Sequence, residues 1–280
     1  MTLAERGTFM NGCLPTVPFR ALVDAVRHAG FDSLSLWPNV WRHALAREGL
    51  SLAEMRAMLD DQGLRVTDLD GCRDWLPPDD PGARLRSPTS RRIPRGEYAE
   101  VGRALGATTV VAVPVSTRPL DHNREADALA QLCVDFAEHG LRVALEYVGW
   151  EMVHDLATAR SLIGASPVPA GLVVDIGHHL RGGSTLADLA QVAASEVYTV
   201  QLNDGSLRPP ADLVAEAMFD RRPPGQGEFP IEEFVAILER KQVRCSVGVE
   251  IYSRDYETMP PGDVVAQIHA MTSAFTHTDG

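Results

Sequence analysis

Short apolar or β-branched runs, each followed by turn residues and a longer segment with helical periodicity, recur along the chain. This alternation is typical of parallel strands joined by helices. The eight expected strands are residues 8–12, 33–37, 65–69, 108–113, 142–146, 172–175, 197–202 and 246–251. The expected helices are residues 18–28, 51–61, 95–104, 121–138, 153–163, 186–193, 231–240 and 262–275.

Glycines mark several places where a helical segment gives way to a strand. Gly30, Gly63, Gly106 and Gly140 each stand there, where a left-handed helix cap is needed. Eight such units match a closed (β/α)8 barrel better than an open doubly wound sheet, which usually carries a dinucleotide-binding fingerprint. No G-x-G-x-x-G follows the first expected strand. We therefore predict an α/β fold, one TIM-barrel domain over residues 1–280.

Charge and composition narrow the classes of partner. The formal net charge of −12 disfavours a nucleic acid or an anionic membrane, so a small-molecule substrate is expected, with a homo-oligomer left open. Four widely spaced cysteines without a C-x-x-C pair, and no signal-peptide or membrane-span pattern, lead us to expect a cytoplasmic protein. Lys241 is the only lysine, which disfavours Schiff-base chemistry. Neither a G-x-S-x-G nor a P-loop motif is present.

Four expected strands carry a polar side chain at or next to their carboxyl end, after an apolar run. These side chains are Glu146, Asp175, Gln201 and Glu250. In a barrel the carboxyl ends of the strands converge on one mouth, where three carboxylates would repel one another unless a cation compensates. Oxygen ligands suit Mn²⁺ or Mg²⁺ better than a structural zinc. The sequence thus predicts one divalent metal site, although each carboxylate alone could equally be a helix cap.

Two further segments offer candidate substrate-binding groups. His178 follows Asp175 by three residues, where a loop would aim it into the mouth to bind a hydroxyl or carbonyl or to move a proton. His179 is more readily interpreted as a solvent-exposed loop residue. Arg221 and Arg222 precede a Pro- and Gly-rich segment that could hold a guanidinium over the site, and we favour Arg222.

Other features are less specific. Trp37, Trp75 and Trp150 lie near strand ends, where they could wall a pocket or simply pack. Residues 74–92 and 203–230 are rich in Pro, Arg and Asp, and loops of that length are usually functional or mobile. These loops would shape the pocket, but their sequences do not identify the substrate.

Taken together, the strand-end motifs resemble the xylose isomerase-like barrels, often called the sugar phosphate isomerase/epimerase family. The resemblance runs through most of the chain. Its motifs are Ala-Leu-Glu146, Val-Val-Asp175-Ile-Gly-His178, Val-Gln201-Leu-Asn-Asp204, Arg222-Pro-Pro-Gly-Gln-Gly-Glu-Phe and Gly-Val-Glu250, with an early Ala-Gly-Phe-Asp at residues 29–32.

The resemblance implies a metal held by Glu146, Asp175, Gln201 and Glu250. The third position departs from the histidine that is commonest in the family. Glutamine at this position is similar to the pattern in 3-dehydroshikimate dehydratases, and it makes zinc less expected than manganese or magnesium.

The chemistry implied by the resemblance begins with proton abstraction next to a carbonyl and a metal-stabilised enediolate. Glu146 and Glu250 could act as base and acid while His178 binds substrate oxygens. Isomerisation or epimerisation of a sugar-like substrate is the favoured reading, with dehydration as the alternative. A non-catalytic ligand-binding barrel also stays open, whereas the acidic charge balance disfavours an endonuclease-like relative.

Overall fold

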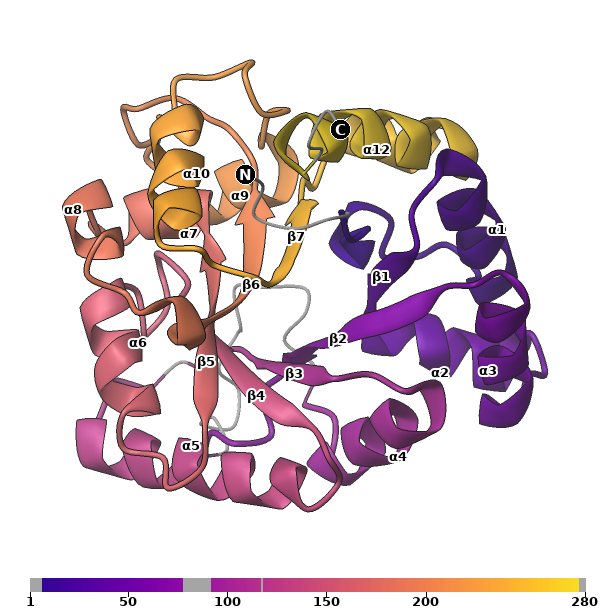
Figure 1. Ribbon diagram of the computed structural model, residues 1–280, viewed down its shortest axis with the longest axis horizontal. Helices are drawn as coiled ribbons and strands as arrows, with labels where there is room; N and C mark the ends of the chain where they lie inside the picture. The colour runs from indigo at the N-terminus through magenta and orange to yellow at the C-terminus, as the bar shows by residue number, and fades with distance from the viewer. Residues whose placement is uncertain (1–6, 78–91, 117, 277–280) are drawn as a thin grey trace.

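The computed structural model describes residues 7–77, 92–116 and 118–276. Seven parallel strands follow one another around the molecule in chain order, and helices surround them (Figure 1). The strands are β1 Ser33–Leu36, β2 Arg65–Cys72, β3 Thr109–Ala112, β4 Arg142–Glu146, β5 Ala170–Asp175, β6 Val197–Leu202 and β7 Ser246–Val249.

The α-helices are α1 Phe19–Ala29, α2 Pro38–Arg47, α3 Leu52–Asp61, α4 Arg95–Leu105, α5 His122–Ala137, α6 Leu156–Ile163, α7 Ile176–Arg181, α8 Leu186–Leu189, α9 Leu213–Phe219, α10 Ile231–Arg240, α11 Arg254–Thr258 and α12 Pro261–Thr276. Two 3-10 turns, η1 Asn11–Cys13 and η2 Ala194–Glu196, complete the described elements. The predicted barrel fold is confirmed.

The first expected strand, residues 8–12, is only partly correct. Thr8 donates a backbone hydrogen bond to Val247 of β7, and Phe9 exchanges backbone hydrogen bonds with Ser33 and Ser35 beside β1. This extended segment therefore joins the first and last strands and occupies the eighth position of the ring. It is too short to form a ladder because the chain turns at once into η1.

Four helices were not expected from the sequence. The helix α2 begins at a proline directly after Trp37, where the missing N–H of proline costs no hydrogen bond. The helices α7, α9 and α11 have five to seven residues and lie inside segments interpreted as loops. Helices this short depend on caps and packing more than on periodicity, so a pattern search misses them. Most of the expected long loop at residues 74–92 lies outside the described residues.

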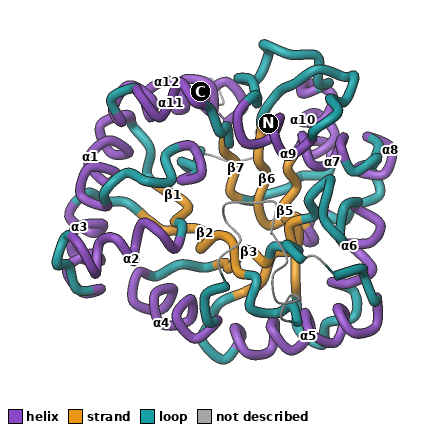
Figure 2. Tube along the Cα trace, turned by 180° about the vertical axis from the view of Figure 1, so that it is seen from behind, coloured by secondary structure: helices purple, strands orange, loops and turns teal. Residues whose placement is uncertain are grey.

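Helices surround the ring of strands (Figure 2), and the apolar core is formed by buried side chains from both. A smaller apolar cluster contains Val111, Ala144 and Val173 of the central strands, together with Val113 and Val115. The glycines expected to cap helices have positive φ, for example 102° at Gly30 and 72° at Gly106, so the chain reverses where predicted. Within the described ranges, no helix is long and apolar enough to span a bilayer.

Candidate active site

The register of the sheet brings the polar strand ends to one rim. Asp175 of β5 pairs with Gln201 of β6, and Glu146 ends β4 opposite Val173. Glu250 comes directly after β7, and its backbone N–H bonds to the Leu202 carbonyl. Because parallel strands place their carboxyl ends at the same edge, the four predicted groups lie on neighbouring strands of one mouth.

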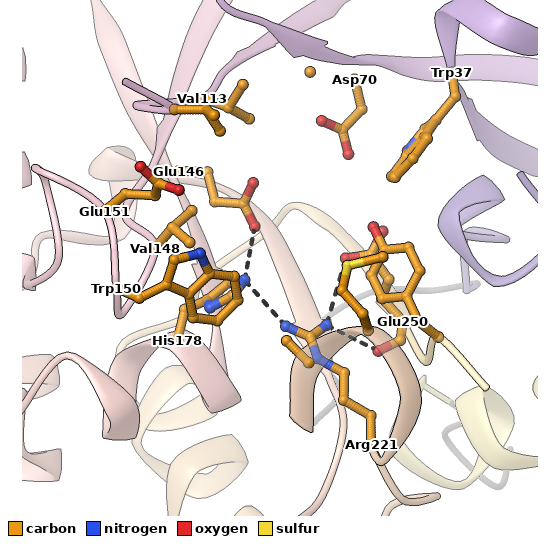
Figure 3. Close-up of a pocket in the computed structure, with 15 residues that line it drawn as sticks. Trp37, Asp70, Val113, Glu146, Val148, Trp150, Glu151, His178, Arg221 and Glu250 are labelled. Carbon is orange, nitrogen blue, oxygen red and sulfur yellow. Dashed lines mark hydrogen bonds and ion pairs between the residues drawn. The ribbon is translucent and has the colours of Figure 1, made fainter. Parts of the chain in front are cut away.

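A pocket opens at this mouth, and Figure 3 shows its lining. Glu146, His178 and Glu250 face the pocket. Gln201 and Asp175 do not line it, being only 2% and 1% exposed.

Asp175 acts first as the cap of α7. Its Oδ1 accepts a hydrogen bond of 2.8 Å from the backbone N–H of His178, which fixes the start of the helix and turns that histidine toward the pocket. Its Oδ2 accepts from Asn203 Nδ2 at 2.7 Å and lies 3.2 Å from Arg221 Nη1. The short sequence Asp-Ile-Gly-His is therefore a helix start that places two functional groups at once.

Arg221, rather than the favoured Arg222, lies in the pocket. Its Nη1 is 3.8 Å from Glu250 Oε2 and donates to the Glu250 carbonyl, while its Nη2 donates to His178 Nε2 at 3.0 Å. Arg222 is exposed, and its backbone pairs with that of Asp204. Neighbouring side chains in such an extended pair point to opposite sides, so only one of the two arginines can face inward.

His178 is a neutral hydrogen-bond acceptor in this arrangement. Burial lowers the pKa of His178 to about 4, and the bond from Arg221 requires a lone pair on Nε2, which leaves the proton on Nδ1. Glu146 Oε1 lies 3.8 Å from the same nitrogen, too far for a hydrogen bond. His179 is buried, not exposed as expected, and hydrogen-bonds Tyr147 and the Thr185 carbonyl.

Three carboxyl groups, one of them not identified from the sequence, face the pocket with raised pKa values. Burial raises the pKa of Glu146 well above its usual value, and the charges of Asp70 and Glu250 raise it further. Burial and Asp70 likewise raise the pKa of Glu250, although Arg221 opposes the shift. Burial raises the pKa of Asp70 to about 7, with neighbouring Asp68 adding to the rise.

Asp70 directly follows the expected strand of residues 65–69 but was not among the predicted site residues; β2 in fact continues to Cys72, so Asp70 lies two residues before its end. The usable signal was an acidic residue at the end of an expected strand, as at Glu146 and Asp175.

The donor chemistry of the site fits a hard divalent cation. Gln201 Oε1 and Glu250 Oε1 are buried and have no hydrogen-bond partner among the described residues. A Cβ on Gly12 would lie 2.5 Å from Glu250 Oε1, so the glycine leaves room for that carboxylate. Buried oxygens without partners are costly unless something else binds them.

The negative charge of the buried carboxylates is nevertheless balanced by an arginine. In the described part of the chain, no three His, Cys, Asp or Glu side chains are grouped closely enough to hold a metal ion. The Arg221 guanidinium lies between Asp175 and Glu250 and supplies their positive partner. A metal would therefore share these carboxylates with Arg221.

Some of the remaining candidates line the pocket, and the others stabilise the structure around it. Trp37 and Trp150 line the pocket, and the Trp150 ring lies edge-on to His178 with centroids 4.9 Å apart. Trp75 is buried, does not line the pocket, and donates a hydrogen bond of 3.1 Å from Nε1 to the Val113 carbonyl. Asp204 accepts backbone hydrogen bonds from Gly225, Gly227 and Phe229, so it shapes the loop after Arg221.

Comparison with known proteins agrees with this fold. The family model for the xylose isomerase-like TIM barrel matches residues 23–274. The chain belongs to this family. Solved structures that share the fold include the IOLI protein with a bound zinc atom, with a TM-score of 0.79 and 19% identity over 97% of this chain and 98% of that one. Another is the probable 3-DHS dehydratase AsbF of Bacillus anthracis, with a TM-score of 0.71 and 14% identity over 98% and 100% of the two chains.

Curated relatives of this xylose isomerase-like barrel belong to two enzyme classes. An inosose isomerase of Halalkalibacterium halodurans is 28% identical over 165 residues, or 56% of this chain and 57% of the relative. A 3-dehydroshikimate dehydratase of Pseudomonas aeruginosa is 26% identical over 262 residues, or 90% of this chain and 38% of the relative. The matched region thus spans about half or less of the length of these relatives.

Proposed function

We propose that this protein is a divalent-metal-dependent isomerase or epimerase acting on a sugar-like hydroxy-carbonyl substrate. The observation that carries the proposal is the pair Glu146 and Glu250, two buried carboxyl groups with raised pKa values that face one pocket. A carboxyl group of raised pKa is suited to exchange a proton near neutral pH.

The reaction begins when one of these carboxylates removes the proton from the carbon next to the carbonyl. The resulting enediolate is negatively charged, and the Arg221 guanidinium, which faces the pocket, can donate hydrogen bonds to it. Return of the proton to the opposite face gives an epimer, and return to the neighbouring carbon gives an isomer. Neutral His178, held in place by Arg221, can bind a substrate hydroxyl.

A divalent ion held by Glu146, Asp175, Gln201 and Glu250 would supply Lewis acidity that polarises the substrate carbonyl. The donor set, three carboxylates and one amide, favours Mn²⁺ or Mg²⁺ because hard cations prefer oxygen ligands. The zinc in the IOLI structure supports a metal in this fold, and replacement of the usual histidine by Gln201 weakens the case for zinc here.

Dehydration is the second candidate, and the match to a 3-dehydroshikimate dehydratase over 90% of the chain favours it. Its first step is the same proton abstraction. The reaction then loses a β-hydroxyl group, for which the second carboxyl group can provide the proton. The two candidates differ only after the shared step.

Exchange of solvent deuterium into a panel of ketoses, keto acids and dehydroshikimate tests that step. We expect exchange with at least one compound when Mn²⁺ or Mg²⁺ is present and none after chelation. Glu250→Gln should abolish it, whereas Glu100→Gln, at an exposed position on α4, should not. Full activity of the metal-free protein, or near-normal activity of Glu250→Gln, would refute the proposal. No exchange together with no bound metal would favour a non-catalytic barrel.

A further inference from the structure

A larger hollow opens beside the carboxylate pocket. The pocket itself has a volume of about 60 Å³, and the adjoining hollow has about 540 Å³. We call this hollow the α2 cleft. Its outer wall is formed by the α2 residues Pro38, Asn39, Arg42, His43, Ala46 and Arg47. The pocket and the cleft share Trp37, Asp70, Gly71, Met218 and Tyr252, so the two are continuous.

The sizes of the two spaces indicate that a substrate would place one part in the pocket and the rest in the cleft. The inner pocket has room on the order of a few water molecules, which is enough for reacting carbons but not for a whole sugar-sized compound. The neck between the spaces is aromatic, with the rings of Trp37 and Tyr252 5.7 Å apart. The rest of a bound substrate must therefore pass this neck and lie in the α2 cleft.

The sign of the charge changes along this path. The inner pocket presents the carboxyl groups of Glu146 and Glu250, and Asp70 stands at the neck. Apart from Asp70 at the neck, no acidic side chain is found among the described residues that line the cleft, while Arg42 and Arg47 face it from α2. An anionic group on the substrate would be repelled near the inner carboxylates and attracted to the far wall.

The two arginines differ in how they are held. Arg42 is fixed by Glu97, with Nε donating to Oε1 at 2.6 Å, and Glu97 does not line the cleft. Arg47, at the exposed end of α2, makes no ion pair within the described part of the chain. The charge of Arg42 is thus balanced by Glu97, whereas the charge of Arg47 is available to bind a new anion.

From this arrangement we infer that the α2 cleft binds the distal anionic group of an elongated substrate. The inference rests on the proposed function, because the hydroxy-carbonyl end occupies the carboxylate pocket. The spacer between the two ends is apolar or ring-shaped, since Trp37, Pro38 and Ile93 line its path. A carboxylate or a phosphate could supply the anionic group.

Matched hydroxyketones separate these possibilities. The probes are 1,6-dihydroxyhexan-2-one, which is neutral, 6-hydroxy-5-oxohexanoate, which ends in a carboxylate, and 6-hydroxy-5-oxohexyl phosphate. Binding is measured by calorimetry and by intrinsic tryptophan fluorescence, to which Trp37 at the neck and Trp150 in the pocket contribute, and deuterium exchange is followed on the same compounds. We expect one of the anionic probes to bind about tenfold more tightly than the neutral one, which corresponds to about 1.4 kcal/mol.

Substitution of Arg47 tests the assignment directly. Arg47→Met should bring the ratio between anionic and neutral probes close to one, and Arg47→Glu should invert it. Arg27→Met is the matched control, because Arg27 is likewise an exposed arginine in the last turn of a helix, α1. Equal binding of all probes, no binding of any probe, or a ratio unaffected by Arg47→Glu would overturn the inference.

The two proposals fail in different ways. Metal-dependent exchange with equal kcat/KM for neutral and anionic probes would leave the proposed function standing and remove the α2 cleft from it. Tight, Arg47-dependent binding of an anionic probe without exchange on any compound would leave the anion site in the α2 cleft standing and refute the proposed function.

Discussion

Replacing Arg221 by methionine should lower the free energy of unfolding, because the carboxylates at the barrel mouth would lose their positive partner. The guanidinium is 5% exposed and lies 3.2 Å from Asp175 and 3.8 Å from Glu250. Burial alone would lower the pKa of Arg221, but these carboxylates raise it above its ordinary value, so the charge is retained. Methionine fills similar space without the charge, which leaves the buried carboxylates uncompensated.

The size of the effect follows from two independent estimates. Removing one partner of a buried ion pair typically costs about 3–5 kcal/mol. The variant can instead protonate one carboxyl group, and doing so at pH 7 for a group of ordinary pKa costs about 4 kcal/mol. We therefore expect a loss of about 4 kcal/mol in the free energy of unfolding and a fall of roughly 10 °C in melting temperature.

The pH dependence gives this prediction a specific signature. A carboxyl group whose pKa is raised in the folded state contributes stability that is full below its unfolded pKa and is lost as pH rises through the folded value. The deficit of Arg221→Met should therefore shrink between pH 7 and pH 5. Urea unfolding at both pH values measures it, with Arg222→Met, at an exposed position, as the control. A deficit below about 1 kcal/mol, or one that is equal at both pH values, would refute the reasoning.

Three further predictions follow from the same site. Asp70→Asn should raise stability at pH 8 but not at pH 4, since the pKa of Asp70 is raised to about 7 and its burial costs stability as pH rises; the gain is at most about 4 kcal/mol, and thermal melts at the two pH values check it. Gly12→Ala should lower deuterium exchange at least about tenfold and cost about 1–3 kcal/mol, because its Cβ would displace Glu250 Oε1; normal exchange would contradict this. Saturating Mn²⁺ should raise the melting temperature of the wild type and have a smaller effect on Glu250→Gln, and equal shifts in both proteins would argue against metal binding at this site.

The sequence was most informative where one physical rule dominated. Strand ends such as Glu146 and Asp175 were predictable because apolar runs show where a strand ends, and the barrel brings all such ends together. The N-terminal segment was harder to assign, since Phe9 completes the ring with only a few hydrogen bonds before the chain turns.

Side-chain direction within loops was not predictable. Arg221 and Arg222 are neighbours of the same type, and only the backbone pairing of Arg222 with Asp204 decides which one points inward. Asp70 required knowledge of which strand residues face the mouth near the end of β2. The charge reversal in the α2 cleft depends on the short helix α2, which the periodicity of the sequence did not show.

A crystal structure of the protein soaked in Mn²⁺, with anomalous diffraction to locate the ion, tests the central claim most directly. We expect a single ion at the barrel mouth, bound by oxygens of Glu146, Asp175, Gln201 and Glu250 at roughly 2.0–2.3 Å. Absence of an ion there at saturating Mn²⁺, with Arg221 still paired to Asp175 and Glu250, would contradict it.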